Sequence, residues 1–256
     1  MKRWKNLACA ATGTKHIKDQ TICQDATDTL IVGNTLIGVV CDGAGSAKFA
    51  DVGAKLVAET TAVALSKEIN NLQVVRIFGF FKLQASARTV FKVFGRVLQL
   101  NIRTLERKAR EMGCEPKDLA TTLIAYVATP SWVGLMQIGD GFVVFRRSGE
   151  KDYELAFPPE KGEYANTTTF VTSSNVAEKM QVGIILDSVD FICASSDGLE
   201  KIALQWGSSV EAFPGFFKGM EGMMRADKYE LLNWIKNETR LMQKTTDDRS
   251  IVVGVR

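Results

Sequence analysis

Several aspartates of this 256-residue chain stand beside apolar runs and next to glycine or other small residues. They are Asp42 in VVCDGAGS, Asp140 in IGDG, Asp197 in ASSDGL and Asp247 in DDRSIVV. Valine favours buried strands, and glycine permits a turn tight enough to leave a carboxylate and nearby backbone carbonyls facing one ligand. A sheet that gathered these strand ends would form an oxygen-rich cluster, the ligand set that Mg²⁺ and Mn²⁺ prefer. The pattern predicts a hydrolase that uses two metal ions.

The first half of the chain is expected to form strands followed by a long helical region. Strands are expected at residues 7–12, 29–32 and 35–42, with a polar loop at 13–26. Gly33 and Asn34 separate the second and third strands, and this spacing favours a tight hairpin turn. Helical periodicity runs from Ala47 to about Asn70, and a long helical region continues to about Met112.

The second half begins with apolar runs that have only short connections, which predicts an antiparallel meander. These runs are LATTLIAYVA from Leu119, WVGLMQI and FVVFRR. Loops with short strands are expected at 157–181, and VDFICASSDGL predicts another buried strand. Residues 200–242 look helical, with an interruption near Pro214 and Gly215, and the last strand begins at about Ser250. Strands and helices form blocks rather than alternating, which indicates an α+β protein with layered antiparallel sheets. We expect a single catalytic domain over residues 1–256.

Composition excludes several classes of protein. A hydrophobic content of 46% is that of a globular protein, and a net charge of +3 is too small to indicate a nucleic-acid partner. The five cysteines form no CxxC pair, which argues against a disulfide framework or a zinc site and favours a reducing cytoplasm. No run approaches the roughly 20 apolar residues of a membrane span. We expect a cytoplasmic protein without a membrane partner.

Basic residues recur at helical spacing in the long helical region. Arg88, Lys92, Arg96, Arg103 and Arg107 fall mostly four or seven positions apart, which places them on one helix face. Such a row is usually a solvated face, and the alternative is a docking surface for an acidic partner.

Other hydrolytic chemistries lack their residues. His16 is the only histidine, and no G-x-S-x-G sequence is present for a serine hydrolase. The chain contains neither a phosphate-binding loop ending in GK[ST] nor GxGxxG. No cysteine has an arginine six positions later, the spacing of thiolate phosphatases. Metal-assisted hydrolysis remains.

An ordered set of short motifs resembles the protein phosphatase 2C family of metal-dependent Ser/Thr phosphatases. The motifs are QDA at 24–26, VVCDGAGS at 39–46, TTL at 121–123, IGDG at 138–141, ASSDGL at 194–199 and DDRSIVV at 247–253. Each motif is weak alone, but together they follow the family order over essentially the whole chain. The glycine-rich form of the Asp42 loop resembles a bacterial subgroup. The resemblance implies a four-layer α-β-β-α sandwich with two central antiparallel sheets.

The resemblance also implies roles for individual residues. Asp42 would bridge two Mn²⁺ or Mg²⁺ ions, and the Gly43 carbonyl would bind one of them. Asp197 and Asp247 would hold the other ion, and Asp25 would act largely through bound waters. Asp140 resembles the residue that helps to bind a third, weaker ion. The implied reaction is in-line attack on phosphorus by a metal-bridging hydroxide, which is available near neutral pH because the ions lower the pKa of bound water.

The chain departs from the family pattern at three places. Ala44 stands where many members carry a histidine that is a candidate general acid. The loop that often supplies an arginine for the substrate phosphate offers Lys15, His16 and Lys18 here, and we favour His16. Gln24 replaces an outer carboxylate, which should weaken one ion's water network without removing a direct ligand.

The interpretation with most support is a Mn²⁺/Mg²⁺-dependent phosphatase that acts as a monomer. It would remove phosphate from serine and threonine of proteins phosphorylated by a Ser/Thr kinase. One alternative is a catalytically silent, phosphatase-like binding module. Its expected mark is loss of a metal carboxylate, and every such position here is acidic. The other alternative is the same chemistry on a small phosphate ester or a nucleotide.

Overall fold

Two antiparallel sheets face each other in the computed structural model, which describes residues 3–73, 82–157, 168–237 and 245–256. One sheet has the strand order β1-β12-β9-β6-β7, and the other has the order β2-β3-β4-β5-β8. The strands of the first sheet are β1 (Lys5–Ala11), β6 (Phe142–Arg147), β7 (Glu154–Leu155), β9 (Val189–Ser195) and β12 (Arg249–Val255). Those of the second are β2 (Asp25–Val32), β3 (Thr35–Asp42), β4 (Leu123–Ala128), β5 (Val133–Ile138) and β8 (Gln181–Ile185).

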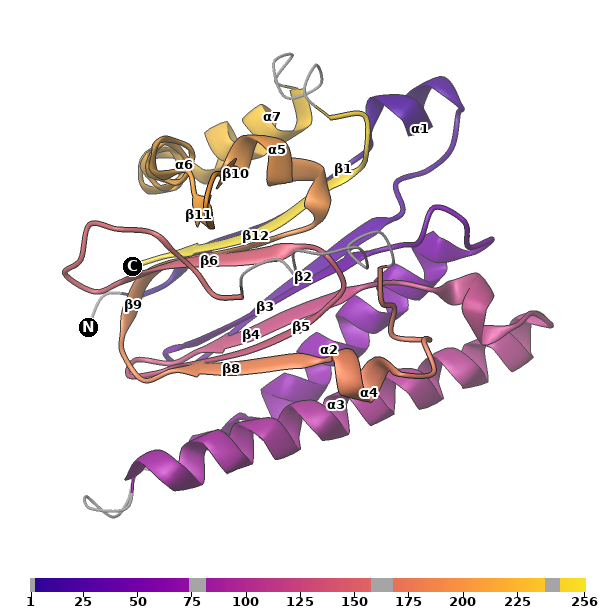
Figure 1. The fold of residues 1–256 in the computed structure, drawn as a ribbon, viewed down its shortest axis with the longest axis horizontal. Helices are drawn as coiled ribbons and strands as arrows, with labels where there is room; N and C mark the ends of the chain where they lie inside the picture. The colour runs from indigo at the N-terminus through magenta and orange to yellow at the C-terminus, as the bar shows by residue number, and fades with distance from the viewer. Residues whose placement is uncertain (1–2, 74–81, 158–167, 238–244) are drawn as a thin grey trace.

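Helices cover the outer face of each sheet (Figure 1). The helices α6 (Pro214–Ala226) and α7 (Lys228–Asn237) lie against the sheet that contains β1 and β12, and α2 (Ala50–Gln73) and α3 (Lys82–Met112) cover the other sheet. The apolar layer between the sheets includes Leu36, Tyr126 and Val252, all fully buried. The prediction of a four-layer α-β-β-α sandwich is confirmed. None of the described helices combines the length and the apolar character that a membrane crossing requires.

The hairpin at Gly33 and Asn34 is confirmed. Val32 pairs with Thr35 at its end, and Gly33 has a φ of +60°, a conformation in which glycine avoids the penalty that a side chain would incur. The pairing continues in register along the whole hairpin as far as Asp25 opposite Asp42. The hairpin therefore delivers two carboxylates to the same end of the sheet.

The predicted meander is wrong for its third strand. The strands β4 and β5 pair with each other, but β6 pairs with β7 and β9 in the opposite sheet. The chain passes from one sheet to the other at Gly139–Gly141, where Gly139 has a φ of +103°. A Cβ on Gly139 would lie 2.5 Å from the Thr122 side chain. Asp140 thus lies on the connection between the two sheets.

Other predicted boundaries also need correction. The expected loop at 13–26 contains a short helix, α1 (Thr14–Lys18), and its last residues already belong to β2. The region at 200–242, expected to be helical, begins with α5 (Glu200–Ala203) and contains a two-stranded sheet of β10 (Leu204–Trp206) and β11 (Val210–Ala212). Pro214 begins α6 instead of interrupting a helix, because proline lacks only an N–H that has no partner in the first turn.

The remaining elements are the 3₁₀ turns η2 (Pro116–Leu119) and η3 (Asp197–Leu199), and α4 (Val176–Lys179). Parts of the predicted long helical region and of the 157–181 loops lie outside the described residues.

Candidate metal centre

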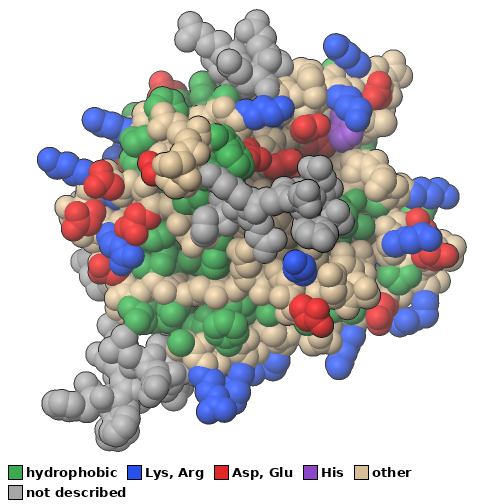
Figure 2. All heavy atoms as spheres, viewed as in Figure 1, with side chains coloured by type: hydrophobic (Ala, Val, Ile, Leu, Met, Phe, Trp, Pro, Cys, Tyr) green, Lys and Arg blue, Asp and Glu red, His purple; other side chains and the backbone are tan. Residues whose placement is uncertain are grey.

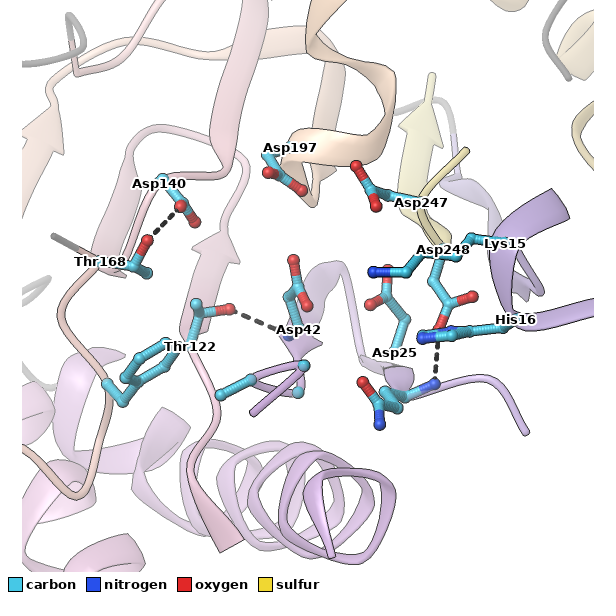
Figure 3. A pocket seen from close by; sticks show the side chains of 15 residues that line it. Lys15, His16, Asp25, Asp42, Thr122, Asp140, Thr168, Asp197, Asp247 and Asp248 are labelled. Atoms are coloured by element: carbon cyan, nitrogen blue, oxygen red, sulfur yellow. Dashed lines mark hydrogen bonds and ion pairs between the residues drawn. The ribbon is translucent and has the colours of Figure 1, made fainter. Parts of the chain in front are cut away.

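A polar pocket of about 250 Å³ opens at one end of the two sheets. Asp42 reaches it from the end of β3, Asp197 from the turn after β9, and Asp140 from the crossing between the sheets. Asp25, from the start of β2, and Asp247, from the residues before β12, also line this pocket. The structure therefore brings every aspartate singled out in the sequence to one pocket, although these residues lie far apart along the chain (Figure 3).

Asp42, Asp140 and Asp197 form the tightest group. Each has a carboxylate oxygen within 4.8 Å of an oxygen of the other two. Asp247 also faces the pocket but does not belong to the group of carboxylates within 4.8 Å of one another. The donors are hard oxygens, the chemistry that Mg²⁺ and Mn²⁺ select, so the residues present fit the predicted cations. Gly43, expected to offer its carbonyl, follows Asp42 directly and also lines the pocket.

The Asp42 backbone is fixed by the neighbouring strand. Its N–H donates to the Thr122 hydroxyl oxygen at 2.9 Å, and its carbonyl accepts the Thr121 hydroxyl at 2.9 Å and the Thr122 N–H at 2.8 Å. Both threonines are buried. The two threonines of the TTL motif thus hold the Asp42 backbone by hydrogen bonds, and the Asp42 side chain faces the pocket.

Asp25 is the most deeply buried of these carboxylates, with 8% of its surface exposed. The Ser196 hydroxyl donates to its Oδ2 at 2.8 Å, one residue before Asp197. Burial raises the pKa of Asp25 to about 7, and the hydrogen bonds from Ser250 and Ser196 oppose this change. Asp25 lines the pocket, and its expected role, to act largely through bound waters, stays a prediction.

The pocket concentrates negative charge. Burial, and after it the nearby charges of Asp25, Asp197 and Asp140, raises the pKa of Asp42 to about 10. The pKa of Asp197 is raised by burial and then by Asp140, and that of Glu200 by burial and then by Asp197. Carboxyl groups in such surroundings hold protons unless another positive charge is present. A divalent cation at this position would supply that charge.

Asp248 is a residue whose role the sequence did not reveal. Its carboxylate accepts the Gly13 N–H at 2.7 Å and the Gln24 N–H at 2.6 Å, and its Oδ2 lies 2.9 Å from His16 Nδ1. It therefore joins the start of β12 to the loops on either side of α1. The acidic pair DD was the only sequence signal, and it did not distinguish a residue facing a metal from one holding a loop.

The basic residues of the predicted phosphate loop divide into two sets. Lys15 and His16 line the pocket, with Lys15 extending into it from α1 (Figure 3). Lys18 is exposed and does not line it. His16 uses one ring nitrogen on Asp248, so only Nε2 is left for a ligand. A neutral ring that donates from Nδ1 to Asp248 has an unprotonated Nε2, which cannot donate to a phosphate oxygen.

Part of the pocket wall is apolar. Ala44 and Phe170 line the pocket there, and the Phe170 ring packs with a small cluster of alanines that includes Ala44. Thr168 donates its hydroxyl to Asp140 at 2.6 Å. The position where many family members have a histidine is thus filled by a methyl group next to an aromatic ring.

Comparisons with known proteins agree with this architecture. The sequence profile of the family described as Protein phosphatase 2C matches residues 12–238. The chain is 26% identical over 266 residues to Serine/threonine-protein phosphatase 3 of Escherichia coli strain K12, covering 98% of each chain.

Among solved structures, a bacterial serine phosphatase has a TM-score of 0.63 at 16% identity, with 99% of this chain and 98% of that one covered. The catalytic domain of the phosphatase PstP in complex with two manganese ions has a TM-score of 0.60 at 13% identity, with coverage of 98% and 97%. These two structural likenesses concern the fold, whereas the profile match covers most of the sequence. The chain belongs to the protein phosphatase 2C family.

Proposed function

We propose that this protein is a phosphatase that uses Mn²⁺ or Mg²⁺ to hydrolyse phosphoserine and phosphothreonine in proteins phosphorylated by a Ser/Thr kinase. The observation that carries the proposal is the close grouping of Asp42, Asp140 and Asp197 at 4.8 Å or less. Family membership and the similarity to a bacterial Ser/Thr phosphatase support the same chemistry. A pocket wall that offers Lys15 supports an anionic substrate.

The ligands proposed for two cations are Asp42, shared by both, with the Gly43 carbonyl, Asp197 and Asp247. Asp140 would hold a third cation more weakly. When bound, the cations would lower the pKa of water, so that hydroxide can attack phosphorus in line with the leaving oxygen, and would stabilise negative charge on the phosphoryl oxygens. Asp25, whose carboxylate accepts the Ser196 hydroxyl, would act largely through bound waters.

Substrate phosphate would be held by α1. The Lys15 side chain reaches into the pocket. Its ammonium group can donate hydrogen bonds to phosphate as it stands, whereas the His16 ring must first gain a second proton. His16 would donate from Nε2 only when the ring is protonated, because Nδ1 is paired with Asp248. Lys15 therefore joins His16 as a residue proposed to bind phosphate.

Release of phosphate from a phosphothreonine peptide tests this proposal. The reaction should require Mn²⁺ or Mg²⁺, stop on addition of EDTA and disappear in Asp42→Asn. Asp152→Asn is a matched control, since Asp152 is an exposed aspartate outside the pocket and loses the same charge. Turnover retained in Asp42→Asn, or lost equally in Asp152→Asn, would contradict the assignment.

Two further measurements separate the alternatives. Calorimetric titration with Mn²⁺ shows whether the carboxylates bind the ion, whatever the activity. Competition between a phosphopeptide and small phosphate esters in one assay ranks the substrates. Metal binding with no turnover of any of them would indicate a silent module, and preference for an ester would indicate a small-molecule phosphatase.

A further inference from the structure

The outer face of α3 carries a row of cations with an apolar groove between them. The groove is lined by Lys92, Gly95, Arg96, Gln99, Leu100 and Arg103, which recur every three or four positions along one side of the helix. We call these six residues and the adjoining Phe91 the α3 stripe. Figure 2 shows Lys and Arg side chains along the edge of the molecule formed by α3 in Figure 1.

The stripe is separate from the side of α3 that holds the fold together. Val93, Phe94 and Val97 are almost completely buried against the sheet and α2. In contrast, the residues Phe91 and Leu100 have relative exposures of 55% and 44%. Burial of the inner face therefore accounts for the fold, and it gives no reason for large apolar groups on the outer face.

Charge on the stripe is largely uncompensated. Between Glu68 and Glu106 the sequence contains no acidic residue. Arg96 pairs with Glu68 of α2 at 2.8 Å, but among the described residues neither Lys92 nor Arg103 has an ion pair. Fully solvated cations need no partner, but cations that flank exposed apolar groups are suited to bind an acidic amphipathic segment.

Gly95 adds a second, independent feature. Glycine destabilises the interior of a helix relative to alanine, and a Cβ at Gly95 would meet no atom of the described residues within 4 Å. Packing within the described part of the chain therefore does not require glycine here. The missing side chain leaves a notch between Lys92, Gln99 and the neighbouring groups of the stripe, in which a partner's side chain can approach the helix backbone.

We propose that the α3 stripe is a docking surface for an acidic amphipathic helix of a partner protein. The partner's carboxylates would pair with Lys92 and Arg103, and an apolar side chain would enter the notch at Gly95 and contact Phe91 or Leu100. A membrane surface fits less well, because insertion requires a broad apolar face and the stripe alternates its few apolar groups with cations and Gln99.

Fluorescence anisotropy with a labelled, helix-forming peptide tests the proposal. The probe carries Glu along one edge and Leu along the adjoining face, and a second peptide replaces each Glu with Lys. The acidic probe should bind the wild-type protein more weakly as salt rises, and the basic peptide should not bind. The double variant Lys92→Glu/Arg103→Glu should weaken binding at least about tenfold, because it replaces attraction with repulsion.

Matched variants separate the stripe from general effects of charge and of glycine. Lys218→Glu/Lys236→Glu makes the same change in net charge on the opposite helix layer and should leave binding unchanged. Gly95→Leu should fill the notch and weaken binding, whereas Gly222→Leu on α6, where a Cβ also meets no described atom within 4 Å, should have no effect. Circular dichroism would check that each variant is folded.

The outcomes decide the proposal without reference to phosphatase activity. No binding of the acidic probe, or equal loss in the Lys218/Lys236 variant, overturns it. Sedimentation with phosphatidylserine vesicles that depends on Lys92 and Arg103, without peptide binding, also overturns it and assigns the stripe to a membrane surface.

Discussion

The Asp248 carboxylate meets the His16 ring at 2.9 Å, although the two residues lie 232 positions apart in the chain. The same carboxylate accepts the backbone N–H groups of Gly13 and Gln24. Asp248 is 5% exposed, so these hydrogen bonds form largely away from water. The helix that presents Lys15 and His16 is therefore held against the end of β12, where Asp247 and Asp248 precede the strand.

Asp248→Asn should reduce both stability and substrate binding. The asparagine amide has one acceptor oxygen, so its N–H₂ group must face at least one of the three donors, which are the Gly13 N–H, the Gln24 N–H and the His16 ring. A buried donor left without an acceptor lowers the stability by about 1–3 kcal/mol. We expect a lower urea midpoint and a higher KM, with a smaller change in kcat, because α1 would lose its position. An unchanged urea midpoint would show that the three contacts add nothing to the fold.

Lys15→Ala and His16→Ala should both raise KM. Loss of a charge-assisted hydrogen bond to phosphate corresponds to about a tenfold increase for Lys15. The effect at His16 should be smaller, because its Nδ1 is already bound to Asp248 and only Nε2 is left for the phosphate. Lys18→Ala is the matched control, since Lys18 is exposed on the same helix and lies outside the pocket lining. If Lys18→Ala raises KM as much as Lys15→Ala does, the effect belongs to general charge and not to the pocket.

Sequence patterns predicted most of the strands because apolar runs and short turns are local signals. They predicted the hairpin of β2 and β3 down to its turn at Gly33 and Asn34. They failed for β6, since its partner β9 lies more than 40 residues later and nothing near Phe142 indicates a change of sheet. The short helix α1 was missed because five residues, TKHIK, carry no apolar period.

The residues of the site were likewise predicted where the signal was local and missed where it depended on contacts distant in the sequence. Each aspartate beside a strand end could be recognised from its neighbours, but the motif order of a known family was needed to place them together. Asp248 could not be assigned a role, since its partners are backbone groups of residues 13 and 24 and the His16 ring, all far away in the sequence. Glu200, whose pKa is raised by burial and then by Asp197, was not singled out either, and it does not line the pocket.

The metal-free protein should become less stable as pH rises. The pKa values of Asp25 and Asp42 are raised from 3.8 to about 7 and about 10 in the fold, mainly by burial. Above pH 4 the unfolded chain has lost these protons while the folded protein still holds them, so stability falls as pH rises through the folded values. Thermal unfolding in EDTA should show Tm decreasing between pH 5 and 9, by less in Asp42→Asn. Added Mn²⁺ should remove this decrease, and a Tm that rises with pH in EDTA would contradict the charge assignment.

Gly43→Ala should damage the site, and Gly45→Ala should not. A Cβ at Gly43 would lie 2.7 Å from the Gln24 carbonyl oxygen and 2.8 Å from Ala50, so the loop after Asp42 or the start of α2 would have to shift. At Gly45 the nearest atom would be the Gln24 side-chain oxygen at 4.0 Å, which is ordinary contact. Overpacking of this kind costs about 1–3 kcal/mol, and a shift of the backbone next to Asp42 should also weaken Mn²⁺ binding. Calorimetry and urea unfolding of the two variants check both effects. Equal metal affinity in the two would mean that the close approach at Gly43 has no part in positioning Asp42.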